Sequence, residues 1–372
     1  MKRKSKVYLT LILLIILIIA SLLVIRFAVD CTLHVYYVDS NGATITAPKT
    51  YMGKWLDSVR LDTKLKGYKQ TEKGSQTQRL SLKSKSIVMR YKLDRNKNQI
   101  KSSITRARYL GVASQLINTK QIGKKQVDPL ESTAMLRIVT SNDGNKWQSQ
   151  AINYPNVNIR YPRIYKSKEY WLILGDNQIL STNNFSDWNY SKLSLSEAKY
   201  AGIFNPNLVK SGKTTYIVFQ SWTKADGSDT HLYFAEFNPL NSAIGVPKKL
   251  DIEKKASTLQ GFSIKRVKGQ LVLTGIDTDR NKVKIYRSAG MYNRFSNTKV
   301  KQNKSADNLS TVNLMNVEGE NRLYYSSYRV SGSVGWRNDV KYVRLDNNKI
   351  NYNKANFVST NTLLTNLSVL KN

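Results

Sequence analysis

Short apolar runs separated by turns recur along most of the chain. Within residues 160–188, an X-Pro step at Tyr161-Pro162 forces an extended entry, and the aromatic and aliphatic run from Tyr170 to Leu174 predicts a buried strand. Further strand–turn–strand units follow over residues 204–219, 260–274 and 313–325. A unit that cannot bury both of its faces alone, repeated along a chain, is typical of a radial or stacked array.

This repeat predicts a five-bladed β-propeller over residues 104–372. Pro162, Pro206, Gly261 and Asn313 open successive units at steps of roughly 45 to 55 residues, which fits one four-stranded sheet per blade. Another blade is expected over residues 109–147. A β-sandwich is the alternative, because it too is built from short strands with frequent turns.

The N-terminus has a different pattern. Basic residues between Lys2 and Lys6 precede an uncharged, apolar stretch from Val7 to Ile25, which is long enough for a bilayer core of about 30 Å. Basic residues next to a membrane span stay on the cytoplasmic side. Residues 1–30 are therefore expected to form a cytoplasmic tail and a single transmembrane signal anchor, with the later domains outside the cell. A cleaved signal peptide is the alternative, but Arg26-Phe27 follows the apolar stretch and no small-residue cleavage pattern is present.

Residues 32–93 predict a small β domain. Leu33 to Val38 alternates, a turn with Asn-Gly at its tip follows at Asp39 to Gly42, and a last strand runs from Ser86 to Leu93. This pattern resembles the mucin-binding-protein (MucBP) repeat of Gram-positive surface proteins. The matching residues are Val35, Tyr37, Val38, Asp39, Gly42, Ile45, Gly53, Gly67, Tyr68, Val88, Arg90, Tyr91 and Leu93. The resemblance implies a β-grasp-like or Ig-like domain that serves as a spacer or, more weakly, binds mucin or glycan. The polar residues 94–103 are then expected to be a linker.

The net charge of the chain limits the class of partner that it is expected to bind. A formal net charge of +34 and a pI near 10.0 favour an anionic partner, such as an acidic polysaccharide or a cell-wall polymer, although a generally basic surface gives the same composition. Nucleic acid is disfavoured, since the basic residues are spread over every segment instead of clustering with stacking aromatics. A single cysteine, Cys31, excludes a disulfide framework within the chain.

The openings of the predicted blades resemble those of glycoside hydrolase family 43, the arabinanase and xylosidase type of five-bladed propeller. In that family, carboxylates in D-P, P-E and E-G-P steps serve as base, acid and acid-tuning residue. The corresponding residues here are Tyr161, Asn207 and Gln260, which cannot exchange a proton as a carboxylic acid does. Amides still bind sugar hydroxyls, and a tyrosine ring can stack on a pyranose.

The expected function is therefore a membrane-anchored, extracellular binder of glycan or cell-wall polymer without catalysis. The candidate ligand-binding residues of the central funnel are Arg160, Tyr161, Asn205, Asn207, Gln260, Phe262 and Asn313. A structural role for these residues is the alternative, and so is a glycosidase with relocated carboxylates. Six acids near predicted strand ends could supply those carboxylates: Asp176, Asp226, Asp229, Glu236, Asp277 and Glu318. Neither His34 nor His231 has partners at metal-ligand spacing, so we expect no metal and no cofactor.

Overall fold

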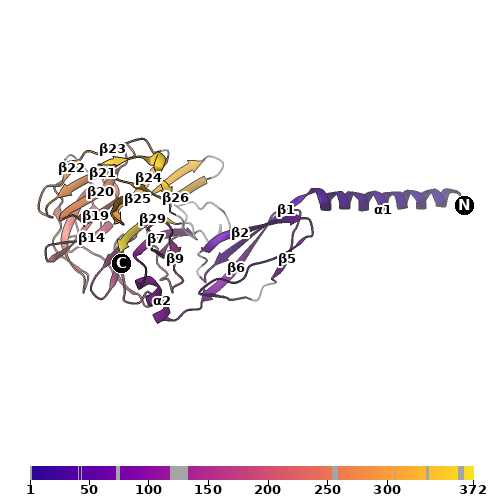
Figure 1. The fold of residues 1–372 in the computed structure, drawn as a ribbon, viewed down its shortest axis with the longest axis horizontal. Coiled ribbons are helices and arrows are strands. Elements are labelled where there is room, and N and C mark those ends of the chain that lie inside the picture. The colour runs from indigo at the N-terminus through magenta and orange to yellow at the C-terminus, as the bar shows by residue number, and fades with distance from the viewer. Residues whose placement is uncertain are drawn as a thin grey trace. The chain divides into compact units, whose positions relative to one another are not determined.

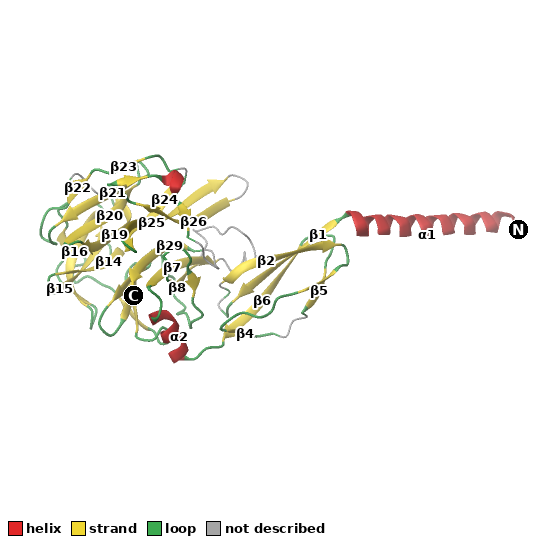
Figure 2. Ribbon diagram, in the orientation of Figure 1, coloured by secondary structure: helices red, strands yellow, loops and turns green. Residues whose placement is uncertain are grey.

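The computed structural model describes residues 2–40, 42, 44–72, 76–117, 133–253, 259–305, 307–331, 335–358 and 364–372. The side chains of residues 2–11, 23, 47, 117, 329–331 and 335–338 lie outside this set as well. The chain divides into two compact units, Met1–Asp94 and Arg95–Asn372. Both units consist mainly of β-strands joined by turns and loops, as Figure 2 shows, so the predicted mainly-β class is confirmed.

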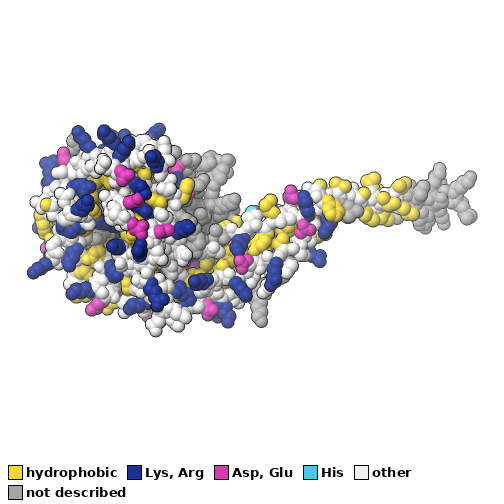
Figure 3. Space-filling model, viewed as in Figure 1, with side chains coloured by type: hydrophobic (Ala, Val, Ile, Leu, Met, Phe, Trp, Pro, Cys, Tyr) yellow, Lys and Arg dark blue, Asp and Glu magenta, His cyan; other side chains and the backbone are white. Residues whose placement is uncertain are grey.

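The first unit begins with helix α1, Lys2–Ala28. The apolar side chains described between Ile12 and Leu22 are exposed (Figure 3). Within the part of the chain that the structure describes, no helix combines the length and the apolar character needed to cross a membrane. The predicted span over residues 7–25 lies partly outside the described side chains, and the transmembrane anchor is not confirmed.

A mixed four-stranded sheet forms the body of the first unit, in the order β2-β1-β6-β4. These strands are β1 (Asp30–Val38), β2 (Thr44–Lys54), β4 (Tyr68–Gln70) and β6 (Lys85–Leu93). β1 and β6 pair in parallel, whereas the two outer pairings are antiparallel. The short strands β3 (Ser58–Arg60) and β5 (Thr77–Arg79) pair separately. A central parallel pair distinguishes this sheet from the antiparallel sheets of an Ig-like sandwich.

Close packing explains one glycine of this unit. A Cβ atom on Gly53 would lie 2.8 Å from Cδ1 of Leu80, which is buried in the core with Tyr37 and Tyr91. A larger residue at position 53 would therefore displace the core. Gly42 of the predicted hairpin tip has a φ of 81°, while Asn41 of that tip lies outside the described residues.

The described residues of the second unit form five antiparallel sheets of at least four strands each. The first sheet holds β10 (Arg163–Lys166), β11 (Trp171–Gly175), β12 (Gln178–Thr182) and β13 (Asn189–Lys192). The next holds β14 (Phe204–Ser211), β15 (Thr214–Ser221) and β16 (His231–Asn238), with β17 (Ala243–Ile244) and β18 (Lys248–Lys249) at its edge. The third holds β19 (Leu259–Val267), β20 (Gln270–Asp277), β21 (Lys282–Ser288) and β22 (Ser296–Thr298).

Two further sheets complete the unit. One holds β24 (Asn308–Val317), β25 (Glu320–Ser331), β26 (Gly335–Arg344) and β28 (Asn356–Phe357). The other joins β29 (Thr365–Lys371) to β7 (Tyr109–Ile117), β8 (Thr133–Ser141) and β9 (Gln148–Ser149). Figure 1 shows the yellow β29 beside the purple β7. Outside these sheets lie the pair β23 (Lys301–Gln302) and β27 (Lys349–Ile350) and the short helix η2 (Tyr352–Lys354).

The innermost strands of these sheets are β10, β14, β19, β24 and β29. Each contacts the next in this order, and β29 also contacts β10. Sheets that meet through their first strands are the blades of a β-propeller. The blade predicted over residues 109–147 takes its innermost strand from residues 365–371, which the local pattern around residue 109 could not indicate.

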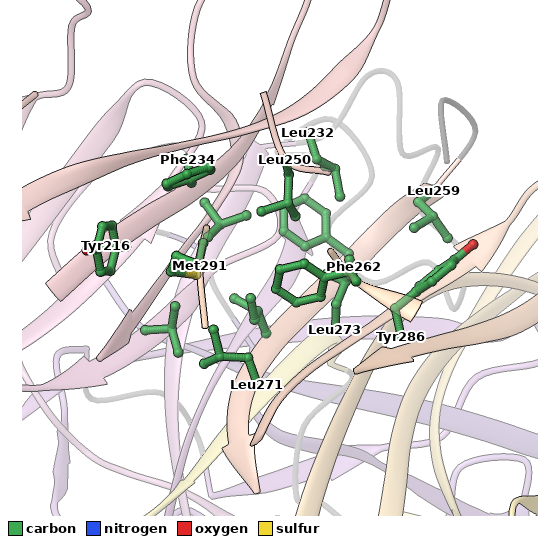
Figure 4. Packing of buried hydrophobic residues seen from close by; sticks show 14 residues of the cluster. Tyr216, Leu232, Phe234, Leu250, Leu259, Phe262, Leu271, Leu273, Tyr286 and Met291 are labelled. Carbon is green, nitrogen blue, oxygen red and sulfur yellow. The ribbon is translucent and has the colours of Figure 1, made fainter. Parts of the chain in front are cut away.

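Apolar side chains hold neighbouring blades together. One cluster combines Val209, Tyr216 and Phe234 from the β14–β16 blade with Phe262 and Leu271 from the β19–β21 blade. Figure 4 shows Phe262 inside this cluster. The β14–β16, β19–β21 and β24–β26 blades each pack against both of their neighbours through clusters of this kind, as the repeat requires.

Residues 94–103 do not form the predicted linker. Helix α2, Lys97–Thr105, begins with a capping box in which the Asn96 side chain accepts from the Gln99 amide and the Gln99 side chain accepts from the Asn96 amide. Ile100 and Ile104 are buried, four residues apart on one helical face. Only two apolar residues define that face, so the polar residues around them give the sequence the pattern of a linker.

Candidate functional site

Backbone bulges mark the beginning of the innermost strands. Asn205, Gly261 and Asn366 have φ values of 51°, 52° and 57°, and each coincides with a shift in pairing register. Tyr161 occupies the same place before β10, with a φ of 51°. A positive φ is rare for a bulky residue, and such strained positions gather at functional sites. This end of the innermost strands is therefore a candidate functional site.

A group of polar side chains, here called the entry cluster, lies at this end: Arg160, Tyr161, Arg163, Asp176 and Asn205. Asp176 Oδ1 accepts a 2.8 Å hydrogen bond from the Asn205 amide. Burial raises the pKa of Asp176, and the Asn205 bond and the charge of Arg163 partly oppose this shift. Burial and the charge of Asp176 raise the pKa of Tyr161. Asp176 and Tyr161 thus share one partly enclosed environment.

Aromatic rings flank the entry cluster on the next blade. Phe204 opens β14, and Trp222 directly follows β15, whose end pairs with the beginning of β14. The two rings are stacked, with centroids 4.5 Å apart and planes 16° apart. Both side chains are half-buried, so each retains an accessible part.

Two of the predicted funnel residues lie deeper than expected. Asn205 and Asn207 are 8% and 4% exposed. The Asn205 side-chain amide donates to Gln220 Oε1 at 3.3 Å, and that of Asn207 donates to the carbonyls of Asn205 and Phe262 at 2.9 and 3.3 Å. Asn205 Oδ1 has no partner among the described residues. The Asn207 side chain therefore links the bulge to the neighbouring blade. The Oδ1 atom of Asn205 can still accept a hydrogen bond from a ligand.

The remaining predicted residues lie apart from one another. Gln260 is exposed beside the bulge of β19. Phe262 is fully buried in the core between two blades, because the bulge at Gly261 turns the following side chain away from the innermost edge. Asn313 is 1% exposed and donates to Ser368 Oγ at 3.1 Å. The structure thus brings Arg160, Tyr161 and Asn205 together but not Phe262 or Asn313.

The six acids considered for a relocated catalytic pair are dispersed. Asp176 is the one whose charge acts on both Tyr161 and Arg163. Glu318 pairs with Arg108 at 2.6 Å, Asp277 lies 3.6 Å from Lys284, and Asp229 accepts from the Lys224 amide at 2.9 Å. Asp226 accepts from the Ser228 amide, and Glu236 is exposed on β16.

Among the residues that the structure describes, no group of three or more His, Cys, Asp or Glu side chains is placed to hold a metal ion. His231 Nε2 lies 2.8 Å from Lys249 Nζ, and burial and the charge of that lysine lower the pKa of the imidazole.

A second site, here called the basic cavity, lies toward the other end of the innermost strands. It has a volume of about 430 Å³. Polar residues of its wall come from all five innermost strands: Arg163, Asn207, Lys265, Asn313 and Ser368. Sequence reasoning missed Arg163, Lys265 and Ser368. Arg163, Asn207 and Ser368 each lie two places after a left-handed residue at the opening of an innermost strand, and all three line this cavity.

No family model matches the chain, and no curated protein is similar to it in sequence. Solved structures with a partial resemblance include the RS223 β-xylosidase, with a TM-score of 0.49 and 8% identity over 69% of this chain and 93% of that one. Another is CoXyl43, a family GH43 β-xylosidase/α-arabinofuranosidase from a compost microbial metagenome, with a TM-score of 0.49 and 11% identity over 65% and 90%. A third is an α-L-arabinofuranosidase of Clostridium thermocellum, with a TM-score of 0.45 and 9% identity over 65% and 88%. Because all three TM-scores lie below 0.5, these similarities assign neither a family nor an activity to this chain.

Proposed function

We propose that this protein binds polysaccharide without cleaving it, through the entry cluster and the adjacent aromatic rings. The observation that carries the proposal is Tyr161, a bulky residue in a left-handed conformation at the opening of β10, beside Asp176. Strain of this kind costs of order 1–3 kcal/mol and persists where the surroundings fix it. A ring held in this way is preorganised for stacking.

The available side chains suit sugar recognition. Tyr161, Phe204 and Trp222 supply partly accessible rings, and such rings stack on the apolar face of a pyranose. Asn205 Oδ1 is an acceptor without a partner among the described residues, and Asp176 adds a charged acceptor for hydroxyl groups. Binding sites for small molecules combine an apolar wall with a few placed polar groups in this way.

Binding to an array of neutral and anionic polysaccharides, including arabinan, xylan and wall glycans, tests the proposal. We expect Tyr161→Ala and Trp222→Ala each to weaken binding of the retained glycan at least tenfold. Tyr190→Ala is the matched control, since Tyr190 is 58% exposed on the outer strand β13. Equal affinities for the wild-type protein and all three variants would exclude the entry cluster as the glycan site.

Hydrolysis is the second candidate, and the raised pKa of Asp176 favours it, because a general acid must hold its proton near neutral pH. A glycosidase needs two carboxyl groups, about 5–5.5 Å apart for retention and about 6.5–9.5 Å for inversion. Release of reducing sugar that is lost in Asp176→Asn would establish hydrolysis. No release from any polysaccharide that the protein binds would exclude it for those substrates.

The location and the role of the first unit are a separate part of the proposal. The apolar stretch of residues 7–25 supports attachment to the outer face of a cell membrane, and the MucBP-like pattern of residues 32–93 supports a spacer. Protease accessibility of the second unit on intact cells, combined with membrane fractionation, tests both. Recovery of the full chain in the cytoplasmic fraction would refute the surface location.

A further inference from the structure

We propose that the basic cavity is a second site, which binds an oxyanion of the phosphate class carried by a small hydroxylated ligand. Six cationic side chains line it, and its described lining contains no Asp or Glu: Arg163, Lys166, Lys210, Lys265, Arg266 and Lys371. Among the ion pairs of the described residues, none involves any of these six. Arg163 also belongs to the entry cluster, so the variants used to test this site are at Lys265, Lys210 and Lys371, which lie outside that cluster.

Arg163 provides the strongest evidence. Its side chain is 3% exposed, and Nη2 donates to the carbonyls of Gly261 and Phe262 at 3.2 and 2.8 Å. Its Nε and Nη1 atoms are buried and have no partner among the described residues. A buried donor without a partner is costly, and more so when it is charged. Adjacent guanidinium donors match the geometry of two oxyanion oxygens.

Lys265 places a second cation in the same cavity. Its Nζ donates to the Val369 carbonyl at 2.5 Å, and an ammonium group has further donors to offer. Burial and the charge of Arg163 lower the pKa of Lys265 to about 7. Two cations that repel each other in an enclosed space are a fitting pair for one divalent anion, which relieves the repulsion.

The rim and the wall define the ligand further. Lys210 and Lys371 are exposed at the rim, where they raise the local concentration of anions. In the wall, Asn313 Oδ1 is a buried acceptor without a partner among the described residues, which suits a ligand hydroxyl group. A volume of about 430 Å³ holds more than the anion alone. A phosphorylated sugar or polyol, free or at the end of a polymer, combines these features.

Calorimetric titration of the full chain with sulfate, inorganic phosphate and glycerol 3-phosphate tests this site. We expect glycerol 3-phosphate to bind most tightly, and Lys265→Met to weaken all three at least tenfold. Lys282→Gln is the matched control, because Lys282 is exposed on β21 away from the cavity. If glycerol 3-phosphate binds no better than inorganic phosphate, the site takes the anion alone, and the inferred hydroxyl contact is wrong.

Sulfate also gives a readout that a purely structural role of Lys265 would not change. Since sulfate does not titrate near neutral pH, its affinity should fall by up to tenfold per pH unit above pH 7, as free Lys265 loses its proton. The Lys265→Met variant should show no such fall. Should that variant not fold, the double variant Lys210→Gln/Lys371→Gln at the exposed rim should still weaken binding. Absence of binding by all three anions at millimolar concentration, or equal binding by wild type and the rim variant, would overturn the proposal.

Discussion

At the scale of single residues, the left-handed positions at the strand openings have different physical bases. Asparagine, at 205 and 366, is one of the few residues other than glycine that adopt this conformation readily. Gly261 is needed for a second reason: a Cβ atom there would lie 2.0 Å from the Ser310 carbonyl oxygen and 2.6 Å from Thr311 Cα. Two innermost strands, β19 and β24, can approach this closely only at a glycine.

Gly261→Ala should therefore destabilise the second unit by more than about 3 kcal/mol, since the backbone of β24 must move as well. Gly269→Ala in the β19–β20 turn is the control. Its φ is 81° with nothing within 4 Å, so it carries only the conformational cost of about 1 kcal/mol. Urea unfolding of both variants measures the difference. Similar midpoints for the two would contradict the close approach of β24.

Lys265 makes stability depend on pH. Its pKa of about 7 in the folded state lies below the value of about 10.4 expected in the unfolded chain. Below pH 7 both states hold the proton, and the folded state carries the full cost of the buried charge. From pH 7 to about 10 the unfolded state binds more protons, so the free energy of unfolding rises. In buffer without phosphate or sulfate, we expect the Tm of the wild-type protein to rise relative to that of Lys265→Met as the pH is raised from 7 to about 10. Parallel profiles of Tm against pH for the two proteins would show that folding does not lower the pKa of Lys265.

At the scale of elements, the sequence predicted where strands lie better than it predicted which strands pair with each other. The alternating and apolar runs of β10, β11 and β12 follow directly from residues 163–182. The pairing of β29 with β7 joins residues more than two hundred positions apart, which no local pattern encodes. For the same reason the candidate site was predicted in part: Tyr161 and Asn205 carry local signals, whereas the convergence of Arg163, Lys265 and Ser368 depends on the arrangement of blades.

The capping box at the beginning of helix α2 is a local sequence signal whose contribution to stability can be measured. Asn96→Ala removes the acceptor for the Gln99 amide, whose bond is 2.9 Å long, and should lower the stability of the second unit by about 1 kcal/mol. Lys101→Ala, on the exposed face of the same helix, should have no measurable effect. Thermal unfolding followed by circular dichroism distinguishes the two. An unchanged Tm for Asn96→Ala would mean that α2 frays independently of the blades.

At the scale of the whole second unit, β29 connects the two ends of its chain. It pairs with β7 in its own sheet and contacts the innermost strands β10 and β24. Its side chains Leu367 and Val369 are buried with Trp147 and Tyr324 of other strands. Removing β29 would expose the apolar faces of two blades and leave β7 as an unprotected edge.

A chain of residues 95–364 should therefore lose the cooperative unfolding of residues 95–372 and should aggregate. The milder variant Val369→Ala, which keeps the strand, should cost about 1–3 kcal/mol through the cavity that it leaves. Differential scanning calorimetry compares the three proteins. If residues 95–364 unfold at the same temperature as residues 95–372, contacts between neighbouring sheets alone hold the blades together, and β29 does not contribute to stability. If the transition broadens or disappears, the strand from the C-terminal end is part of the cooperative unit, and the basic cavity, whose wall includes Ser368 of β29, forms only when both ends of the unit have met.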